Sequence, residues 1–401
     1  MADLETDRVD PGRACAQSDF PRELGRHIGQ TPGPLVICVG GMHGNEPAGA
    51  FAAQRVVRAL ESQGPPFRGT LVALAGNRAA LARGCRFVAE DFNRMWLPER
   101  LAGLSLEAGQ SALNVEEREC RELLEAIGAA LARRRGPIIF LDLHTTSAPG
   151  IPFAIIADTL TNRRLARSLP APVILGLEEQ LDGTTLNYMN DRGYAAVGFE
   201  GGQNEAPSSI EHNEAALWTI LVAAGCLREE SIPQAALART RLAESTVGVP
   251  PILEVRYRHA IEADDQFVME PGYVNFQPVA RGQLLARDRR GEIRAGESGR
   301  ILLPLYQSQG ADGFFLVREV SPRWLRVSAL ARRTRLERLL PVLPGIRRDP
   351  QRPDALIVDP RIARWLAVDL LHLLGYRRRR SEGGKIVVTR RPGDIESFSQ
   401  W

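Results

Sequence analysis

Between Pro34 and about Cys226, short apolar runs alternate with stretches of helical periodicity, and this alternation limits the folds open to the chain. The strand candidates are "PLVICVG", "GTLVALAG", "PIIFLDLH", "IPFAIIAD", "APVILGL" and "AAVGFEGG". The helix candidates include residues 50–62, 115–134, 161–168 and 210–224. Strands interleaved with helices predict an α/β domain with a mixed, mostly parallel sheet flanked by helices. In such domains functional residues gather at the carboxyl ends of the strands.

The composition changes after about residue 245. Residues 246–330 contain short alternating strands with glycine-bearing turns, which predict a smaller β-rich domain. Residues 331–401 hold one strong helix candidate, "PRIARWLAVDLLHLLGY", and then a basic stretch, so we expect a helix and strand appendage there. Together with an N-terminal extension (1–33) and a main domain (34–245), the sequence predicts four regions.

Composition excludes several classes of protein. The net charge of the 401 residues is only +3, so the chain lacks the overall charge typical of proteins that bind nucleic acid or membrane surfaces, and we expect neither partner. No stretch approaches the roughly 18 apolar residues of a membrane span, and the N-terminus lacks the apolar core of a secretory signal. Five cysteines without a C-x-x-C pair predict a reducing, cytoplasmic setting. The oligomeric state is left open, a homo-oligomer included.

Arginine carries nearly all the positive charge, because Lys385 is the only lysine. The main domain therefore offers no lysine for Schiff-base chemistry. The run Arg377–Arg380 is interpreted as a solvated helix end, although contact with an acidic partner is the alternative.

The first chemically informative motif is "HGNE", directly after the first apolar run. His43 and Glu46, three residues apart among small neighbours, can converge on one cation. His144 ends another apolar run, "PIIFLDLH", and belongs at the same edge of the sheet. Two histidines and one carboxylate form the ligand set of a catalytic zinc with an open position. Asp142, two residues before His144, is a candidate to orient its imidazole; a salt bridge or cap is the alternative.

A further carboxylate and an arginine-rich loop complete the candidate site. Glu200 ends the apolar run "AAVGFE" before two glycines, a position that suits a general base. In "GCRFVAEDFNR", Asn93 and Arg94 could hold a substrate carboxylate, and Arg86 could stabilise an oxyanion. Taken singly, each arginine is better explained as a surface residue, because the chain contains many arginines.

The motifs "HGNE", "GNRAALARGCRFVAEDFNR", "LDLHTT" and "FEGG", in this order, resemble the succinylglutamate desuccinylase/aspartoacylase family, whose catalytic domain is similar to zinc carboxypeptidases. The resemblance covers about residues 34–226 and extends more loosely to a β-rich C-terminal domain. It implies one zinc ion per chain, bound by His43, Glu46 and His144. It also implies Glu200 as general acid/base and Arg86 as the residue that polarises the scissile carbonyl.

The same resemblance implies that Asn93 and Arg94 hold the substrate carboxylate. Phe92 replaces the leucine of the family, which keeps an apolar packing position. Arg192 is the candidate for a second carboxylate of the substrate, although its offset from the "FEGG" motif departs from the aspartoacylase pattern. Tyr306 is a candidate lid residue. Residues 282–304 resemble a biotinyl/lipoyl hairpin without its lysine, so a structural or site-covering role is expected.

The resulting hypothesis is a zinc-dependent hydrolase that cleaves the amide bond of an N-acyl amino acid, or of a similar small carboxylate-bearing amide, by a metal-activated water. Two alternatives stay open. One is a carboxypeptidase-like peptidase with the same site. The other is an inactive binding protein with an arginine-rich C-terminal region.

Overall fold

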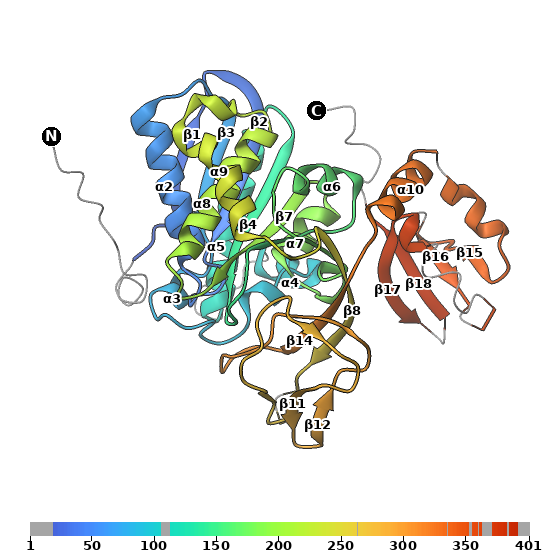
Figure 1. The fold of residues 1–401 in the computed structure, drawn as a ribbon. Helices are drawn as coiled ribbons and strands as arrows, with labels where there is room; N and C mark the ends of the chain where they lie inside the picture. The colour runs from blue at the N-terminus through green and yellow to red at the C-terminus, as the bar shows by residue number, and fades with distance from the viewer. Residues whose placement is uncertain are drawn as a thin grey trace.

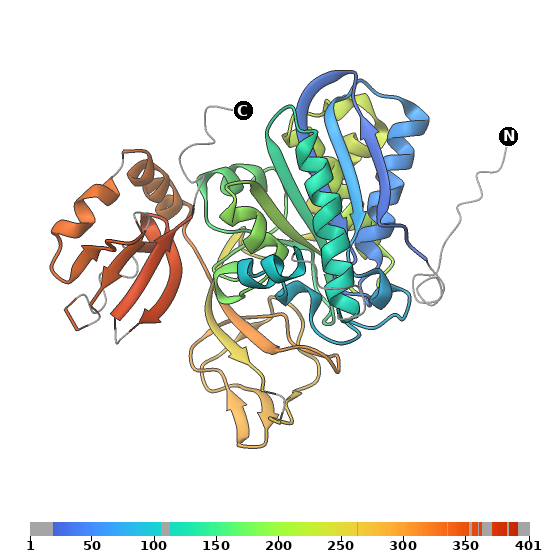
Figure 2. The same cartoon turned by 180° about the vertical axis from the view of Figure 1, so that it is seen from behind.

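The computed structural model describes residues 19–105, 113–262, 264–334, 336–352, 355–359, 361–362, 371–382 and 385–391. Its architecture is mixed α/β, as predicted. One large sheet lies among helices, a smaller β-rich region extends from it, and a C-terminal appendage stands to one side (Figures 1 and 2).

The large sheet joins strands from most of the chain. In spatial order its strands are β1 (Glu23–Ile28), β3 (Arg68–Ala75), β2 (Thr31–Gly40), β4 (Ile138–Thr146), β7 (Ala195–Gln203), β5 (Phe153–Ile155), β6 (Val173–Leu175), β8 (Ile252–Ala260), β14 (Asp312–Glu319), β13 (Gly299–Leu302) and β10 (Pro278–Val279). The pairings within β3–β2–β4–β7 and within β5–β6–β8 are parallel. Those at β1, between β7 and β5, and beyond β8 are antiparallel. The predicted parallel strands thus form the centre of a mixed sheet.

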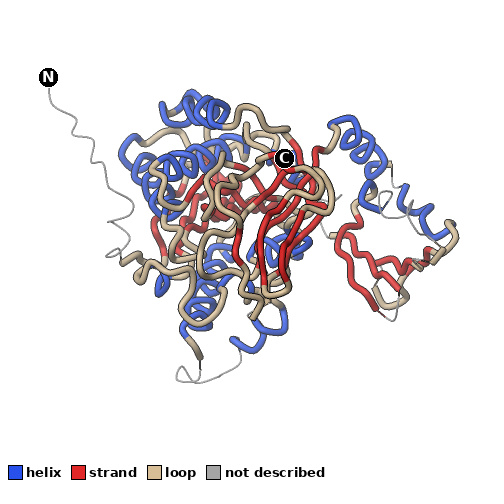
Figure 3. The backbone as a smooth tube through the Cα atoms, turned by 60° about the horizontal axis from the view of Figure 1, so that its bottom comes forward, coloured by secondary structure: helices blue, strands red, loops and turns tan. Residues whose placement is uncertain are grey.

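Helices cover both faces of this sheet (Figure 3). One face carries α2 (Ala48–Gln63), α6 (Leu160–Ala166), α8 (Ser208–Ala223) and α9 (Pro233–Ser245). The other carries α4 (Pro98–Ser105), α5 (Val115–Ala132) and α7 (Thr185–Asp191). The short elements are α3 (Arg78–Leu81), η2 (Phe92–Arg94), η4 (Glu178–Gln180) and η5 (Glu229–Ser231). The four predicted helices are confirmed, with ends shifted by a few residues. None of the described helices has the length and apolar character needed to cross a membrane.

Alternation along each strand decides which face a side chain reaches. On β4, Leu141 packs in the core beneath α2 and α8, whereas Phe140 packs in the core beneath α5 and α7. Because side chains alternate with a period of two, Asp142 and His144 share the face of Phe140. On the neighbouring β7, Glu200 is the register partner of His144 and lies on the same face. The β-strand pattern therefore brings these polar side chains together.

Glycines around the "HGNE" loop allow unusually close backbone approaches. A Cβ atom on Gly40 would lie 2.3 Å from the carbonyl carbon of Gly49 in α2, and one on Gly44 would lie 2.0 Å from that of Ala80. No side chain fits at either distance. The small residues that flank the motif are thus needed to pack β2, α2 and α3 closely together.

The β-rich region shares the main sheet. Its strands β8 and β14 pair with each other, and β8 also pairs with β6 of the main domain. Beyond them, β9 (Val268–Met269), β11 (Leu284–Asp288) and β12 (Gly291–Arg294) form a separate three-stranded sheet. The boundary predicted at residue 246 therefore crosses a continuous sheet, because an edge strand of one region pairs with the other.

The appendage has its own small core. It contains α10 (Pro322–Arg333), η6 (Leu336–Val342) and a sheet of β15 (Ile346–Arg348), β16 (Ala355–Val358), β18 (Lys385–Arg390) and β17 (Tyr376–Glu382). The helix predicted from "PRIARWLAVDLLHLLGY" falls mostly outside the described residues. The interpretation of Arg377–Arg380 as a helix end is wrong, because the run forms part of β17, which pairs with β18.

A buried ion pair holds the appendage against the main domain. Arg332 of α10 is fully buried; it donates to the backbone oxygen of Asp158 at 2.7 Å and to its Oδ2 at 2.9 Å. Arg163 of α6 contacts the same carboxylate. Within the appendage, Arg332 also donates to the carbonyl oxygens of His372 and Leu373, at 3.0 and 3.1 Å. One guanidinium thus ties the two regions together.

Replacing Arg332 with alanine should therefore lower the free energy of unfolding by about 3 kcal/mol, because buried partners lose their charge-assisted hydrogen bonds. Urea denaturation measures the change. Arg326→Ala, on the exposed side of the same helix, is the matched control and should change the free energy by less than about 0.5 kcal/mol. Equal effects of the two substitutions would contradict the anchoring role.

Candidate metal and hydrolase site

Three sheet strands deliver the candidate site residues to one edge. His43 and Glu46 lie between β2 and α2, His144 lies near the end of β4, and Glu200 lies on β7. Two glycines follow Glu200, and Gly202 has a φ of 120°, which favours glycine. The β4–β7 register shifts immediately after His144 and Glu200 and pairing resumes at Thr146 and Gln203, so these glycines form an irregularity in the strand pairing at the site.

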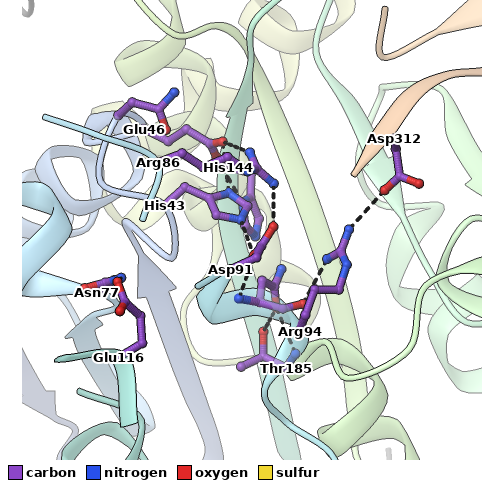
Figure 4. Close-up of polar contacts among 12 residues, drawn as sticks. His43, Glu46, Asn77, Arg86, Asp91, Arg94, Glu116, His144, Thr185 and Asp312 are labelled. Atoms are coloured by element: carbon purple, nitrogen blue, oxygen red, sulfur yellow. Dashed lines mark hydrogen bonds and ion pairs between the residues drawn. The ribbon is translucent and has the colours of Figure 1, made fainter. Parts of the chain in front are cut away.

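Glu46 bridges the two histidines (Figure 4). Its Oε1 lies 2.9 Å from Nδ1 of His43, and its Oε2 lies 3.0 Å from Nδ1 of His144. The backbone N–H of Thr145 donates to Oε2 at 3.3 Å. All three side chains are buried, and their potential ligand atoms lie within 4.8 Å of one another. The predicted convergence of His43, Glu46 and His144 is thus observed.

The outer nitrogens of both imidazoles face carboxylates. Nε2 of His43 lies 3.3 Å from Oδ1 of Asp91, and Nε2 of His144 lies 3.1 Å from Oδ2 of Asp142. A carboxylate on the outer nitrogen favours the tautomer whose inner nitrogen carries a lone pair for a cation. Asp142 therefore occupies the orienting position suggested by its spacing, and Asp91 is a second such residue.

The charges of this cluster also suit a cation. Glu46, Asp91, Asp142 and Glu200 bring four carboxylates together, whereas Arg86 supplies one guanidinium. Burying this excess of negative charge is costly unless a positive charge offsets it. Three nitrogen and carboxylate donors with a fourth position left open are the ligand set of catalytic zinc sites. The donors, their arrangement and the charge balance therefore fit a divalent cation.

The pKa shifts show the same charge distribution. Burial would raise the pKa of Glu46, but His43 and His144 hold it well below its ordinary value. Burial likewise opposes ionisation of Asp91, but His43 and Arg86 lower its pKa well below the usual range.

Glu200 behaves in the opposite way. Burial, reinforced by the charges of Glu46 and Asp142, raises its pKa to about 8, although His144 and Arg86 act against the shift. Its side-chain Oε2 is buried and has no hydrogen-bond partner among the described residues. A carboxylate held in this way accepts and releases protons near neutral pH.

Arg86 reaches the site from the loop after α3. It donates from Nη1 to Glu46 Oε1 at 3.2 Å and from Nη2 to Asp91 Oδ2 at 3.3 Å. Its Nε is buried and has no hydrogen-bond partner within the described structure. The loop itself is held by buried Glu116, whose carboxylate accepts from the backbone N–H groups of Val88 and Ala89 at 2.6 and 3.0 Å.

Asn93 lies beside the same cluster. Its Oδ1 accepts from the backbone N–H of Thr185 at 3.0 Å, and the Thr185 hydroxyl donates to Asp142 Oδ2 at 2.7 Å. The backbone N–H of Asn93 donates to Asp91 Oδ1 at 2.9 Å. Thr185 thus links the predicted substrate clamp to the partner of His144.

Arg94 already has a carboxylate partner. Its Nη2 donates to Oδ2 of Asp312 at 3.2 Å, and its Nη1 donates to the carbonyl oxygen of Asn93 at 2.9 Å (Figure 4). Asp312 begins β14 and also accepts from Nε of Arg258 at 2.6 Å. The predicted carboxylate-binding arginine is therefore paired within the chain.

The site opens into a cavity of about 130 Å³. His43, Glu46, His144, Glu200, Arg86, Asn93 and Arg94 all line it, and so do apolar side chains from β5, α7 and the loop before β14. That loop, residues 303–311, is tied across the site: Asn45 of the "HGNE" motif donates to Gln307 at 2.9 Å, and the backbone N–H of Tyr306 donates to Ser147 at 3.2 Å. The β-rich region thus covers the site through this loop.

Two predicted site residues do not join the cavity. Arg192 ends α7 before β7 begins, so it lies near the amino end of that strand, and its guanidinium lies 3.5 Å from the centre of the Tyr188 ring. Proximity to Glu200 in sequence was misleading, because residues 195–199 of the extended strand β7 separate the two. Tyr306 anchors the cover loop instead: its hydroxyl bonds the backbone of Tyr273 and Glu270, at 2.8 Å each. Of the strands in residues 282–304, the hairpin of β11 and β12 lies at the far tip of the β-rich region (Figure 1), whereas β13 belongs to the main sheet.

Sequence reasoning missed Asp91, Thr185 and Asp312. Asp91 precedes the predicted Asn-Arg pair and caps η2, so an aspartate two residues before a functional asparagine was an available signal. Thr185 follows Thr184, which caps α7. Helix capping alone accounts for a threonine pair in the sequence, so the pair gave no signal of a functional site. Asp312 lies 218 residues from Arg94, and no local pattern marks it.

Part of the chain is similar to one family of known proteins. Residues 32–216 match the family model described as the succinylglutamate desuccinylase/aspartoacylase catalytic domain. A probable aspartoacylase of Nostoc sp. is 32% identical over 113 residues, which are 28% of this chain and 35% of that protein. The chain therefore matches about a third of the length of this curated relative.

Solved structures share the fold. A succinylglutamate desuccinylase/aspartoacylase from Rhodobacter sphaeroides has a TM-score of 0.52 at 16% identity, over 75% of this chain and 88% of that one. The ectoine utilization protein EutE (DoeB) from Ruegeria pomeroyi has a TM-score of 0.50 at 20% identity, over 73% and 86%. A succinylglutamate desuccinylase from Vibrio cholerae has a TM-score of 0.50 at 17% identity, over 72% and 82%. At these identities the likeness establishes the fold.

The raised pKa of Glu200 predicts that the free energy of unfolding of the metal-free protein depends on pH. A carboxyl with a pKa of about 8 when folded, against about 4.5 when unfolded, destabilises the fold increasingly as pH rises between these values. We therefore compare the free energies of unfolding of Glu200→Gln and of the natural chain, both with chelator present. The advantage of the variant should increase by about 3 kcal/mol between about pH 5 and about pH 8. Urea denaturation at both pH values measures this difference. Glu205→Gln, an exposed control, should show no trend; a pH-independent Glu200→Gln effect would refute the expectation.

Proposed function

Because residues 32–216 match the model of the succinylglutamate desuccinylase/aspartoacylase catalytic domain, we propose that the chain is a zinc-dependent deacylase that hydrolyses the amide bond of a small N-acylated compound. The observation that carries the proposal is the placement of buried Glu200 beside the His43–Glu46–His144 cluster. The proposal names the amide bond but does not require a carboxylate on the substrate. The reason is that Arg94, which would bind such a carboxylate, already pairs with Asp312.

His43, Glu46 and His144 would hold the zinc ion. When bound there, zinc would polarise the scissile carbonyl and increase the acidity of water. Asp91 and Asp142 would keep both imidazoles oriented through their outer nitrogens.

Glu200 would move the proton. Its Oε2, which has no partner in the described part of the chain, would take a proton from the attacking water. The same oxygen would then deliver the proton to the amine nitrogen as the C–N bond breaks. Arg86, whose Nε is likewise without a partner among described residues, would donate to the oxygen of the tetrahedral intermediate. The products would be a carboxylic acid and a free amine.

The cavity supports a small substrate. Its volume of about 130 Å³ and its cover by residues 303–311 suit a small molecule better than an extended peptide. A carboxypeptidase-like reaction also needs a cation for the peptide carboxylate, and the pairing of Arg94 with Asp312 disfavours it.

We further propose a cytoplasmic setting, since Cys38, Cys85, Cys120 and Cys226 are free thiols.

The metal assignment predicts about one zinc ion per purified chain, lost in a His43→Ala/His144→Ala variant, because two of the three ligands are removed. Elemental mass spectrometry measures the content. His27→Ala, at a histidine outside the cluster, should keep the zinc. A natural chain that takes up no zinc from a zinc-supplemented buffer would refute the site.

The proton role predicts that Glu200→Gln keeps zinc but loses at least about 100-fold in kcat on a cleavable N-acyl amide. Amine release under steady-state conditions measures the loss, and Glu205→Gln should turn over normally. Activity unchanged in Glu200→Gln would remove Glu200 from the mechanism.

A further inference from the structure

Both arginines that line the cavity are already paired with carboxylates of the protein. Arg86 contacts Glu46 and Asp91, and Arg94 contacts Asp312. Among the described lining residues, these two supply the guanidinium groups. An incoming substrate carboxylate would therefore meet Arg86, which faces two carboxylates, and Arg94, whose Nη2 is already taken by Asp312.

Asp312 is built into the wall of the cavity. It lies on the lining together with Arg94, and 13% of its side chain is exposed. Its two oxygens have different partners: Oδ2 accepts from Arg94 Nη2 at 3.2 Å and Oδ1 accepts from Arg258 Nε at 2.6 Å. Arg258 is fixed in turn, because its Nη1 donates to the carbonyl oxygen of Gln180 at 2.5 Å.

The backbone also holds Asp312 in place. It is the first residue of β14 and pairs in register with Ala260 of β8. Because β8 belongs to the main sheet, this carboxylate is positioned by strand pairing. Figure 4 shows the side chain of Asp312 pointing toward Arg94.

A fixed carboxylate on Arg94 changes what can bind there. A second carboxylate would have to approach Arg94 beside the charge of Asp312, and like charges side by side disfavour binding strongly. An uncharged group that donates hydrogen bonds can instead bind to Asp312 itself, because an ionised carboxylate has acceptor sites beyond the two that Arg94 and Arg258 use. Apolar lining residues such as Leu181, Leu305 and Phe315 add no charge.

We propose that Asp312 is a specificity-determining residue that excludes a free carboxylate at Arg94, so that the substrate is an N-acylated compound with an uncharged hydrogen-bond donor, such as a carboxamide, in its place. The inference rests on the proposed deacylase function for the reaction itself. It predicts a selectivity opposite to that of a site in which Arg94 is free to bind a carboxylate.

Matched pairs of ligands test this selectivity: N-acetylated amino acids and their carboxamides, which differ only in the terminal group. Binding is measured by calorimetry on the zinc-loaded Glu200→Gln protein, so that the result does not depend on turnover. The carboxamide should bind more tightly than the acid. Asp312→Asn should shift the ratio at least about tenfold toward the acid, because the like charge is removed. Asp264→Asn, an exposed aspartate of the same region, is the matched control and should leave the ratio unchanged.

A second variant probes the pair from its other side. Arg94→Met leaves Asp312 without this partner, so discrimination against the acid should increase. The inference is overturned if Asp312→Asn weakens binding of the acid, as an orienting role for Asp312 would require, or if neither variant changes the ratio. If the ratio shifts as expected while the natural chain cleaves neither member of any pair, the proposed reaction fails and the role of Asp312 stands.

Discussion

The carboxylate of Glu46 lies between two imidazoles, and much of the site is arranged around this contact. It requires His43 and His144 to approach from different strands and to point their Nδ1 atoms inward. That orientation depends on Asp91 and Asp142 at the outer nitrogens. Each of these aspartates has a further support, from a backbone N–H in one case and a threonine hydroxyl in the other. The arrangement concentrates negative charge that only a cation or protons can relieve.

Much of the fold was predictable from the sequence, because the central parallel strands are continuous apolar runs that signal burial on both faces. The same runs locate His144 and Glu200, since a polar residue at the end of a buried strand stands out. His43 and Glu46 were found because their motif follows such a strand directly. The extension of the main sheet into the β-rich region was not predictable, because strand partners far apart in sequence leave no local periodicity.

The errors in the site have similar causes. Arg192 was chosen by its distance along the chain from Glu200, but it precedes β7, and residues 195–199 of that extended strand separate the two. Asp312 was missed for the converse reason, because a long chain separation hides a direct contact with Arg94. Its presence makes the predicted carboxylate clamp part of a cluster in which Arg94 and Arg258 share one carboxylate. The sequence motif thus identified Arg94 as a site residue, but only the folded structure shows which charged groups surround it.

The strand pairing that carries the cover loop also limits how the cavity can open. Residues 303–311 join β13 to β14, and β14 is continuous through β8 with the strands that hold His144 and Glu200. A rotation of the whole β-rich region would break this sheet. A movement of the cover that leaves the sheet intact is therefore confined to the loop, and it would release the contacts to Asn45 and Ser147. Such a movement would leave His144 and Glu200 in place, because both lie on paired strands of the sheet.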